Sequence, residues 1–244
     1  MFNFTFIKRL MKQITNNIMM IKPVSFRYNQ ETAANNYYQK VLDNISFTQI
    51  QNKALNEFNN FVKKLEDVGV NVIVIEDTQD LDTPDSIFPN NWVSFHDDGT
   101  IVLFPMCAKN RRDERRTDIF DLLTNKFGFK INEVKDFTNF ENDGKYLEGT
   151  GSMVLDREHQ ICYSAISIRT NRELVLRFCK DFGYVPVFFT ANQDVKGKRM
   201  AIYHTNVMMC IADKFAVICL DSIDDKNERK NVINSLISTG KEII

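Results

Sequence analysis

The chain has 244 residues, of which 43% are hydrophobic and 26% charged, a composition that is ordinary for a globular protein with one large domain or two small ones. Its 31 basic and 32 acidic residues give a net charge of −1, which argues against nucleic acid or an anionic membrane surface as a partner. No apolar run approaches the roughly 18 residues that cross a bilayer, and the five cysteines include no CxxC pair, which indicates free buried thiols and a cytoplasmic protein.

Residues 1–15 are expected to be an N-terminal extension ahead of a single domain that spans residues 16–244. Charges interrupt the apolar start and no small-residue cleavage site follows, so the segment is a poor secretory signal. Downstream, the apolar run at 17–26, an amphipathic stretch around 50–65 and the run "NVIVIE" predict a strand, a long helix and a second strand.

The stretch "PDSIFPNNW" places Asp85, Asn90 and Asn91 among large apolar side chains. A surface turn does not need an isoleucine, a phenylalanine and the only tryptophan, and a core strand would not choose an aspartate and two adjacent asparagines. The combination predicts a strand that leads into the lip of a pocket, with Asp85 facing a ligand and Ile87 and Phe88 in the core.

Three later stretches share one pattern of strand, short acidic turn, strand, amphipathic helix, glycine and strand. They begin at "WVSFHDDGTIVLF", "SMVLDREHQICYSAI" and "NVMMCIADKFAVICL", and Gly128, Gly183 and Gly240 end their helices at a near-constant spacing. In the second repeat, Thr170 and Glu173 have the spacing of a capping box at the helix start. The segment from residue 17 to 76 is a looser copy of the same pattern.

Repeats of this kind bury too little surface alone and pack around a common axis, with loops for a site at one end. We therefore expect an α/β domain of radial ββαβ repeats. An open α/β sheet is the weaker alternative, because the paired strands before each helix resemble hairpins. The last strand, "KEII", is short, and about three and a half units are present, so we expect a C-terminally truncated domain.

Several polar residues are not needed by the repeats. Glu148 lies beside two glycines in "YLEGTGSM", and His204 lies between apolar residues in "AIYHTNVMMC". Each has a simple alternative, a solvated loop carboxylate for Glu148 and a satisfied core histidine for His204, but both stand at the start of a repeat, as Asp85 does.

Arg169 and the pair Arg111–Arg112 follow strands at equivalent points of two repeats. Such arginines suit bidentate binding of a ligand carboxylate, although a surface ion pair would also explain them. The run "KNRRDERR" around Arg111 has five positive and two negative charges, and a solvated helix start is favoured over a polyanion site. His96 and His159, in hairpin turns, are expected to be exposed. No motif for a metal, a nucleotide or another cofactor is present.

The ordered set "PDSIFPNNW", "NRRDERR", "YLEGTGSM", "SIRTN" and "HTNVMM" resembles the pentein superfamily of guanidine-modifying, amidinotransferase-like enzymes. The resemblance runs from about Met19 to the C-terminus and is closest to bacterial citrulline hydrolases, with dimethylarginine hydrolases next. It implies a five-bladed ββαβ propeller whose last blade is missing or incomplete in this chain.

The resemblance also implies roles for individual residues. Asp85 matches the aspartate that binds the amino-acid end of the substrate, and Asn91, next to Asn90, stands where many relatives have an aspartate that binds the guanidinium. Arg111 and Arg169 match the arginines that hold the substrate carboxylate. Glu148 and His204 match the catalytic acid and the catalytic histidine.

Two features depart from the family pattern. Gly151 replaces a residue that is often acidic, and neither Cys210 nor Cys219 matches the nucleophilic cysteine, which lies near the C-terminus of relatives. The resemblance therefore implies a cysteine-dependent C–N hydrolase for citrulline or a related amino acid, in an inactive or incomplete form without that nucleophile. The alternatives are a non-catalytic amino-acid-binding or assembly module, and an enzyme completed by a second chain or as a homo-oligomer. Asn91, a neutral amide, favours the neutral ureido group of citrulline over a cationic guanidinium.

Overall fold

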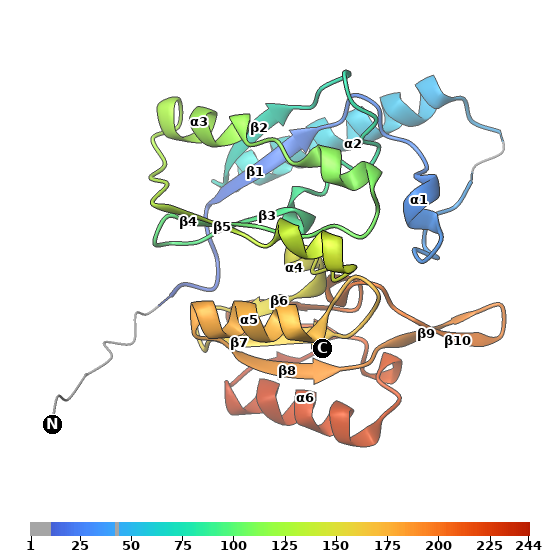
Figure 1. The fold of residues 1–244 in the computed structure, drawn as a ribbon, viewed down its shortest axis with the longest axis vertical. Coiled ribbons are helices and arrows are strands. Elements are labelled where there is room, and N and C mark those ends of the chain that lie inside the picture. The colour runs from blue at the N-terminus through green and yellow to red at the C-terminus, as the bar shows by residue number, and fades with distance from the viewer. Residues whose placement is uncertain (1–10, 42–43) are drawn as a thin grey trace, which may run out of the picture.

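The computed structural model describes residues 11–41 and 44–244, so most of the predicted N-terminal extension lies outside the described residues. Figure 1 shows the helices and strands, which fall into four consecutive groups. The first group contains β1 (Asn17–Lys22), α1 (Gln30–Ala33), α2 (Phe47–Asp67) and β2 (Asn71–Glu76). The predicted strand, long helix and second strand are present, and β1 and β2 pair in parallel.

The other three groups contain the predicted ββαβ units. The second has β3 (Val93–Phe95), β4 (Thr100–Leu103), α3 (Asp118–Asn125) and β5 (Glu133–Asp136), and the third has β6 (Val154–Asp156), β7 (Ile161–Ala165), α5 (Arg172–Phe182) and β8 (Val185–Phe189). The fourth has β11 (Met209–Ile211), β12 (Phe215–Ile218), α6 (Lys226–Ser238) and β13 (Glu242–Ile243). In each unit the first two strands form an antiparallel hairpin and the third joins in parallel.

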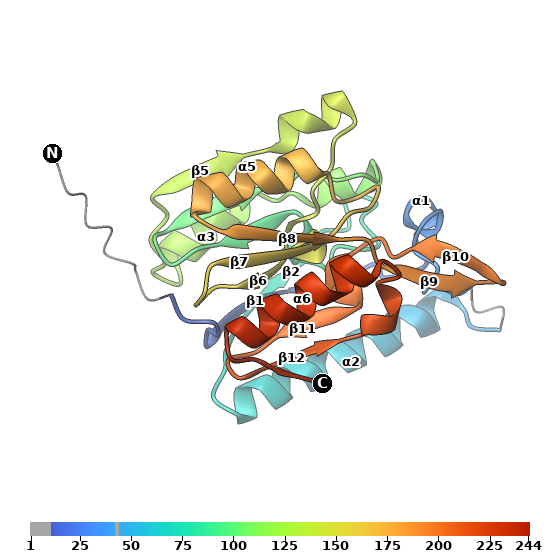
Figure 2. The ribbon, with the colours of Figure 1, turned by 90° about the horizontal axis from the view of Figure 1, so that it is seen from below.

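Short elements connect these units. The 3₁₀ turn η1 (Pro89–Asn91), the helix α4 (Gly149–Ser152) and the 3₁₀ turn η4 (Thr205–Val207) lead into β3, β6 and β11 respectively. The remaining elements are η2 (Asn110–Glu114), η3 (Thr138–Asp143), η5 (Leu220–Ser222) and a hairpin of β9 (Asn192–Val195) and β10 (Lys198–Ala201), which projects from one side in Figure 2.

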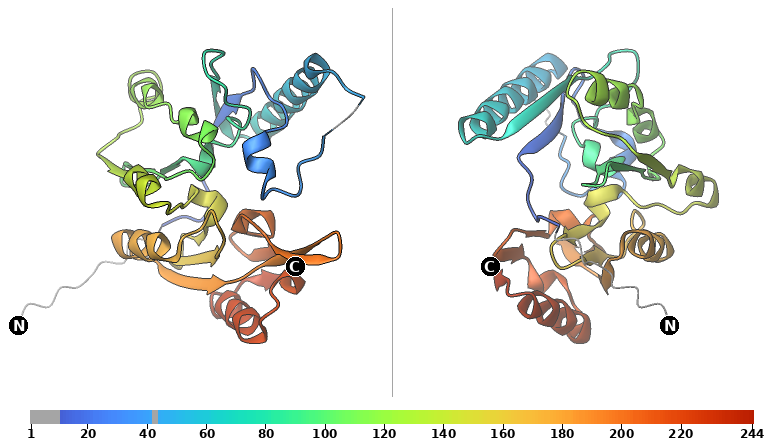
Figure 3. Two further views of the ribbon diagram at one scale, coloured as in Figure 1. Left: turned by 45° about the vertical axis from the view of Figure 1, so that its right-hand side comes forward. Right: turned by 90° about the vertical axis from the view of Figure 1, so that its left-hand side faces the viewer.

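Three core clusters follow one packing rule, in which each helix packs between its own sheet and the preceding one. Ile21 and Ile73 of the first sheet share a cluster with Ile119 of α3. The next clusters join the second sheet to α5 and the third sheet to α6. The helices α2, α3, α5 and α6 therefore lie at the periphery, with α4 near the centre (Figure 3).

The two ends of this row of units are incompletely covered. α2 has no fully buried residue although it is the longest helix, and Phe215 and Val217 of β12 are 39% and 42% exposed. The described residues form separate sheets that do not close into a ring. The mixed α/β fold is thus observed, whereas five blades with an incomplete last one stay a prediction.

Local chemistry explains where several elements begin and end. Gly128, Gly183 and Gly240 have φ values of 71°, 74° and 72°, which confirms the predicted left-handed residues after the helices. The predicted cap of α5 is wrong by one residue. Asn171, not Thr170, is the N-cap, and its side chain accepts hydrogen bonds from the backbone N–H groups of Glu173 and Leu174.

Three further expectations are corrected. "PDSIFPNNW" forms turns and η1 rather than a strand, because Pro89 starts the 3₁₀ turn, and Phe88 is 45% exposed. Of the five cysteines only Cys162 and Cys179 are buried, whereas Cys210 and Cys219 are exposed.

No helix among the described residues is long and apolar enough to cross a membrane.

Candidate functional site

The candidate site lies where the elements that precede three hairpins meet. α4 contacts both η1 and η4, and it lies between the upper and lower groups of elements in Figure 1. Because η1, α4 and η4 occupy the same place in successive units, the last residue of η1 and the N-cap residues of α4 and η4 converge. This convergence brings Asn91, Glu148 and His204 together although they are far apart in the sequence.

Glu148 is the central group, and its side chain is fully buried. Its Oε2 atom lies 2.7 Å from Nε2 of His204 and 3.3 Å from Nη1 of Arg169. Nη1 of Arg111 lies 3.9 Å from the same oxygen. Oε1 accepts a hydrogen bond of 2.9 Å from the backbone N–H of Cys107. The carboxylate is therefore surrounded by donors and positive charge.

These contacts decide the protonation of the pair. Burial alone would raise the pKa of Glu148, but the hydrogen bond and charge of His204 and the charges of Arg169 and Arg111 lower it to about 2. Burial lowers the pKa of His204, and the two arginines act in the same direction against the opposing effect of Glu148. At neutral pH the Glu148 carboxylate is therefore ionised and accepts a hydrogen bond from Nε2–H of the neutral His204 imidazole, which leaves Nδ1 as an acceptor.

Arg111 is buried and its guanidinium is committed to protein partners. Nε and Nη2 donate to the two carboxylate oxygens of Glu114, each at 2.9 Å, and Nη1 donates to Oδ1 of Asn91 at 2.7 Å. The bidentate edge that the sequence assigned to a substrate carboxylate is thus occupied by Glu114. The "KNRRDERR" run is not a solvated helix start, because Arg111 and Glu114 point inward.

Arg169 and Asp85 both bind the segment around α1. Arg169 donates to the backbone oxygen of Thr32 at 3.1 Å and to the side-chain oxygen of Asn35, and its guanidinium lies over the ring of Tyr203. Asp85 accepts hydrogen bonds from Asn29 at 2.8 Å and from Thr32 at 3.1 Å. This segment therefore covers the side of the site that is formed by Arg169 and Asp85.

Two glycines of α4 allow the close packing of the site. Gly149 has a φ of 46°, and a Cβ there would lie 2.2 Å from the backbone oxygen of Asn90. A Cβ at Gly151 would lie 2.5 Å from Nδ2 of Asn91 and 2.8 Å from Cε1 and Nδ1 of His204. The space that an acidic side chain would need at position 151 is filled by the Asn91 amide and the imidazole, which accounts physically for the glycine.

The structure places six of the predicted residues in one network: Asp85, Asn91, Arg111, Glu148, Arg169 and His204. Asn90 borders it through its backbone oxygen, to which Thr150 donates. Sequence reasoning missed Glu114, Asn29, Thr32 and Asn35. The spacing of Arg111 and Glu114 on one turn was a usable signal for the first, whereas nothing local pointed to the other three.

The remaining histidines are less exposed than predicted. His96 stacks on Phe182 with ring centroids 4.3 Å apart, and burial lowers its pKa to about 4. His159 is half-buried and lies 3.0 Å from the carboxylate of Asp156. Neither belongs to the network. Within residues 11–41 and 44–244, no group of three or more histidine, cysteine or acidic residues could hold a metal ion.

Comparison with known families identifies relatives of the chain. The family model of the eukaryotic N,N-dimethylarginine dimethylhydrolases matches residues 22–244. None of the curated protein sequences compared with the chain matches it.

Solved structures share the fold at low identity. The N-terminal domain of ArgZ, an arginine dihydrolase from cyanobacteria, in a substrate-bound cysteine mutant, is 15% identical with a TM-score of 0.66, over 93% of this chain and 75% of that one. A cysteine mutant of AgrE with L-arginine is 15% identical with a TM-score of 0.66, over 93% of this chain and 31% of that one. The dimethylarginine dimethylhydrolase of Pseudomonas aeruginosa, in a cysteine mutant complexed with citrulline, is 14% identical with a TM-score of 0.56, over 88% and 73%. The chain thus spans about a third of AgrE and three quarters of the other two.

Proposed function

Because the chain belongs to the N,N-dimethylarginine dimethylhydrolase family of pentein C–N hydrolases, we propose that its site binds citrulline or a related ureido or guanidino amino acid. The observation that carries the proposal is the buried pair of Glu148 and His204, flanked by Arg111, Arg169 and Asn91. Solved structures with this fold include complexes with L-arginine and with citrulline, which agrees with such a ligand.

The residues divide the work of binding. Asp85 would take the positively charged amino group of the ligand, and Arg169 its carboxylate, in place of the present contacts of both with the α1 segment. Glu148 would accept hydrogen bonds from the ligand nitrogens and orient the reacting carbon. Asn91 is neutral, so it suits a ureido group without leaving a charge unmatched, and citrulline is therefore the favoured ligand.

The chemistry of the family requires a thiolate. It attacks the planar carbon of the ligand, His204 would protonate the departing nitrogen and then activate water, and the water would release the product from the sulfur. None of the five cysteines stands at the family's nucleophile position. Cys107 donates its backbone N–H to Glu148, but burial and the Glu148 charge raise the pKa of its thiol, so it is a poor nucleophile. We therefore expect this polypeptide alone to bind without turnover.

Titration calorimetry with L-citrulline, L-arginine and dimethylarginine tests the proposal. Wild-type protein should bind at least one of them, and Asp85→Asn should weaken binding by about tenfold or more, as expected for loss of a buried charged hydrogen bond. Asp80→Asn, an exposed position, is the matched control and should leave the affinity unchanged. Absence of binding to all three compounds would contradict the proposed function.

An ammonia-release assay tests the expectation of binding without turnover. A non-catalytic binding module, or an enzyme that needs a second chain, releases no ammonia from citrulline when tested alone. Ammonia release that is lost in His204→Ala would show that this polypeptide turns over the ligand at the candidate site, against our expectation.

A further inference from the structure

The orientation of the Asn91 amide follows from the chemistry of its partner. A guanidinium has only hydrogen-bond donors. The atom 2.7 Å from Nη1 of Arg111 is therefore the side-chain oxygen of Asn91. Oδ1 is engaged, and the other end of the amide, Nδ2, faces the opposite side.

Nδ2 of Asn91 lies beside Gly151. It lies near the point where a Cβ of Gly151 would be, as do Cε1 and Nδ1 of His204. No described residue accepts a hydrogen bond from it. Asn91 thus presents a donor, not an acceptor, beside the imidazole of His204.

Glu114 holds the arginine that sets this orientation. Both of its oxygens accept hydrogen bonds from Arg111 at 2.9 Å, and its side chain is fully buried. With Nε and one side of Nη2 bound in this fork, the plane of the guanidinium is fixed. In this plane Nη1 donates to Asn91 at 2.7 Å and lies 3.9 Å from Oε2 of Glu148. Glu114 touches neither Asn91 nor His204 by any hydrogen bond of the structure, so its influence passes through Arg111.

A donor at this position discriminates between two ligand classes. The ureido group of citrulline has a carbonyl oxygen that accepts a hydrogen bond, whereas every nitrogen of a guanidinium is a donor at neutral pH. Nδ2 therefore pairs with a ureido oxygen and opposes a guanidinium.

We propose that Glu114 is a positioning residue that sets ligand preference: by clamping Arg111 it holds the Asn91 amide with Nδ2 toward the ligand and favours ureido over guanidino groups. This inference rests on the proposed function and reassigns Arg111 from binding a ligand carboxylate to orienting Asn91.

A double-mutant cycle tests the inference. Dissociation constants of L-citrulline and L-arginine are measured by calorimetry at pH 8.5 for wild type, Glu114→Gln, Asn91→Ala and the double variant. The alkaline buffer is needed because burial raises the pKa of Glu114 to about 7. Glu114→Gln releases the fork and lets the amide turn, so the ratio of the citrulline constant to the arginine constant should rise about tenfold.

The control is built into the cycle. In the Asn91→Ala background, Glu114→Gln should leave the ratio unchanged, because the side-chain amide whose orientation Glu114 controls is absent. If the role of Glu114 were purely structural, Glu114→Gln would weaken the binding of both ligands by the same factor. An unchanged ratio in Glu114→Gln, or the same change in both backgrounds, would overturn the inference while leaving the proposed function in place if the wild type binds.

A second measurement does not depend on ligand binding. The side-chain NH₂ signals of Asn91, assigned by their loss in Asn91→Asp, should be sharp in wild type, because Arg111 holds the amide oxygen in one orientation. In Glu114→Asp, which keeps the charge but shortens the reach, and in Glu114→Gln, these resonances should shift and broaden as the amide is released. Identical NH₂ signals in the wild type and both variants would refute the clamp, including when neither ligand binds.

Discussion

Glu148 is a charged side chain that is fully buried, and its neighbours stabilise the ionised form. Removal of one partner from such a group leaves an unmatched charge inside the protein, which costs about 3–5 kcal/mol. The carboxylate therefore depends on His204, Arg169 and Arg111 at once. The same dependence makes the stability of the protein sensitive to acid.

The pH dependence has a defined sign at this residue. The folded pKa of Glu148 is about 2 and its ordinary value is 4.5, so below pH 4.5 the unfolded chain takes up a proton that the folded one does not. The stabilisation is present above pH 4.5 and is lost as the pH falls toward 2, at up to about 1.4 kcal/mol per pH unit. His204, whose pKa is also lowered, acts in the same direction from its ordinary value of 6.5 downward.

Urea denaturation of wild type and Glu148→Gln between pH 5 and pH 3 measures this contribution. The difference in the free energy of unfolding between the two proteins should narrow as the pH falls. Glu114 is present in both proteins. Burial raises its pKa from 4.5 to about 7, so its own contribution is lost with rising pH from about 4.5 upward and is common to the two profiles. Parallel pH profiles of the two proteins would contradict the assignment of a lowered pKa to Glu148.

At the scale of elements, the short helix α4 shows how a local sequence serves a distant site. Its residues "GTGS" include no bulky side chain, and the helix fits between η1 and η4 because neither glycine has a Cβ. Gly151 is the informative one, since its φ is in the ordinary range and only space restricts the residue there.

Gly151→Ala is expected to destabilise the protein by about 1–3 kcal/mol, the usual cost of an extra methyl group in a packed interior. The added Cβ would meet Nδ2 of Asn91 at 2.5 Å and the His204 ring at 2.8 Å, so ligand binding should weaken as well. Thr150→Ala in the same helix is the control and should change stability by less than about 1 kcal/mol. Equal stability of Gly151→Ala and wild type, by thermal or urea unfolding, would show that this packing account is wrong.

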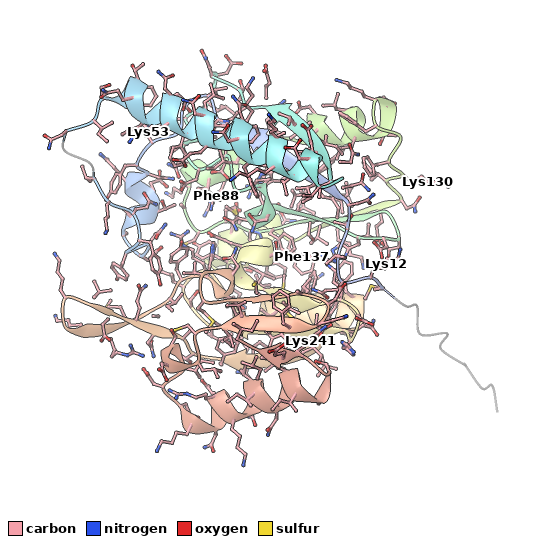
Figure 4. All side chains as sticks on the ribbon, turned by 180° about the vertical axis from the view of Figure 1, so that it is seen from behind. Lys12, Lys53, Phe88, Lys130, Phe137 and Lys241 are labelled. Carbon is pink, nitrogen blue, oxygen red and sulfur yellow. The ribbon has the colours of Figure 1, made fainter. Side chains whose placement is uncertain are left out.

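At the scale of the whole molecule, polar contacts link the third and fourth units. Gln13 donates to the backbone oxygens of Leu155 at 2.9 Å and Ile211 at 3.3 Å, which belong to β6 and β11. Lys241, labelled in Figure 4, donates to the backbone oxygen of Asp213 at 2.7 Å and lies 3.7 Å from a carboxylate oxygen of Asp156. The third and fourth units therefore share more than apolar core.

Lys241→Met keeps the volume of the side chain and removes its charge. Because the side chains of Lys241 and Asp156 are both fully buried, we expect a loss of about 3–5 kcal/mol in the free energy of unfolding. Lys230→Met, at an exposed position of α6, should change stability by less than about 0.5 kcal/mol. A similarly small effect of both variants in urea denaturation would show that the buried pair of Lys241 and Asp156 does not stabilise the contact between the third and fourth units.

Part of this architecture was readable in the sequence, and part of it was not. Alternating and helical apolar patterns, with Gly128, Gly183 and Gly240 after the helices, predicted the three ββαβ units correctly. The errors occurred where one local pattern fits two conformations. "PDSIFPNNW" has the apolar content of a strand, yet Pro89 starts a 3₁₀ turn, and Thr170 and Asn171 are both good capping residues, so tertiary position selected the second.

By itself, the sequence determined the repeat, the mixed α/β class and the identity of six polar residues that the units do not need, because periodicity and turn chemistry are properties of neighbouring residues. Only the tertiary structure decided how those residues are paired. Glu114 takes the bidentate edge of Arg111, Asn35 binds Arg169 across 134 positions of the chain, and the Asn91 amide turns its nitrogen toward His204. Burial is the physical reason, since a hydrogen-bonding group removed from water takes whichever partner the packing of separate units brings within reach.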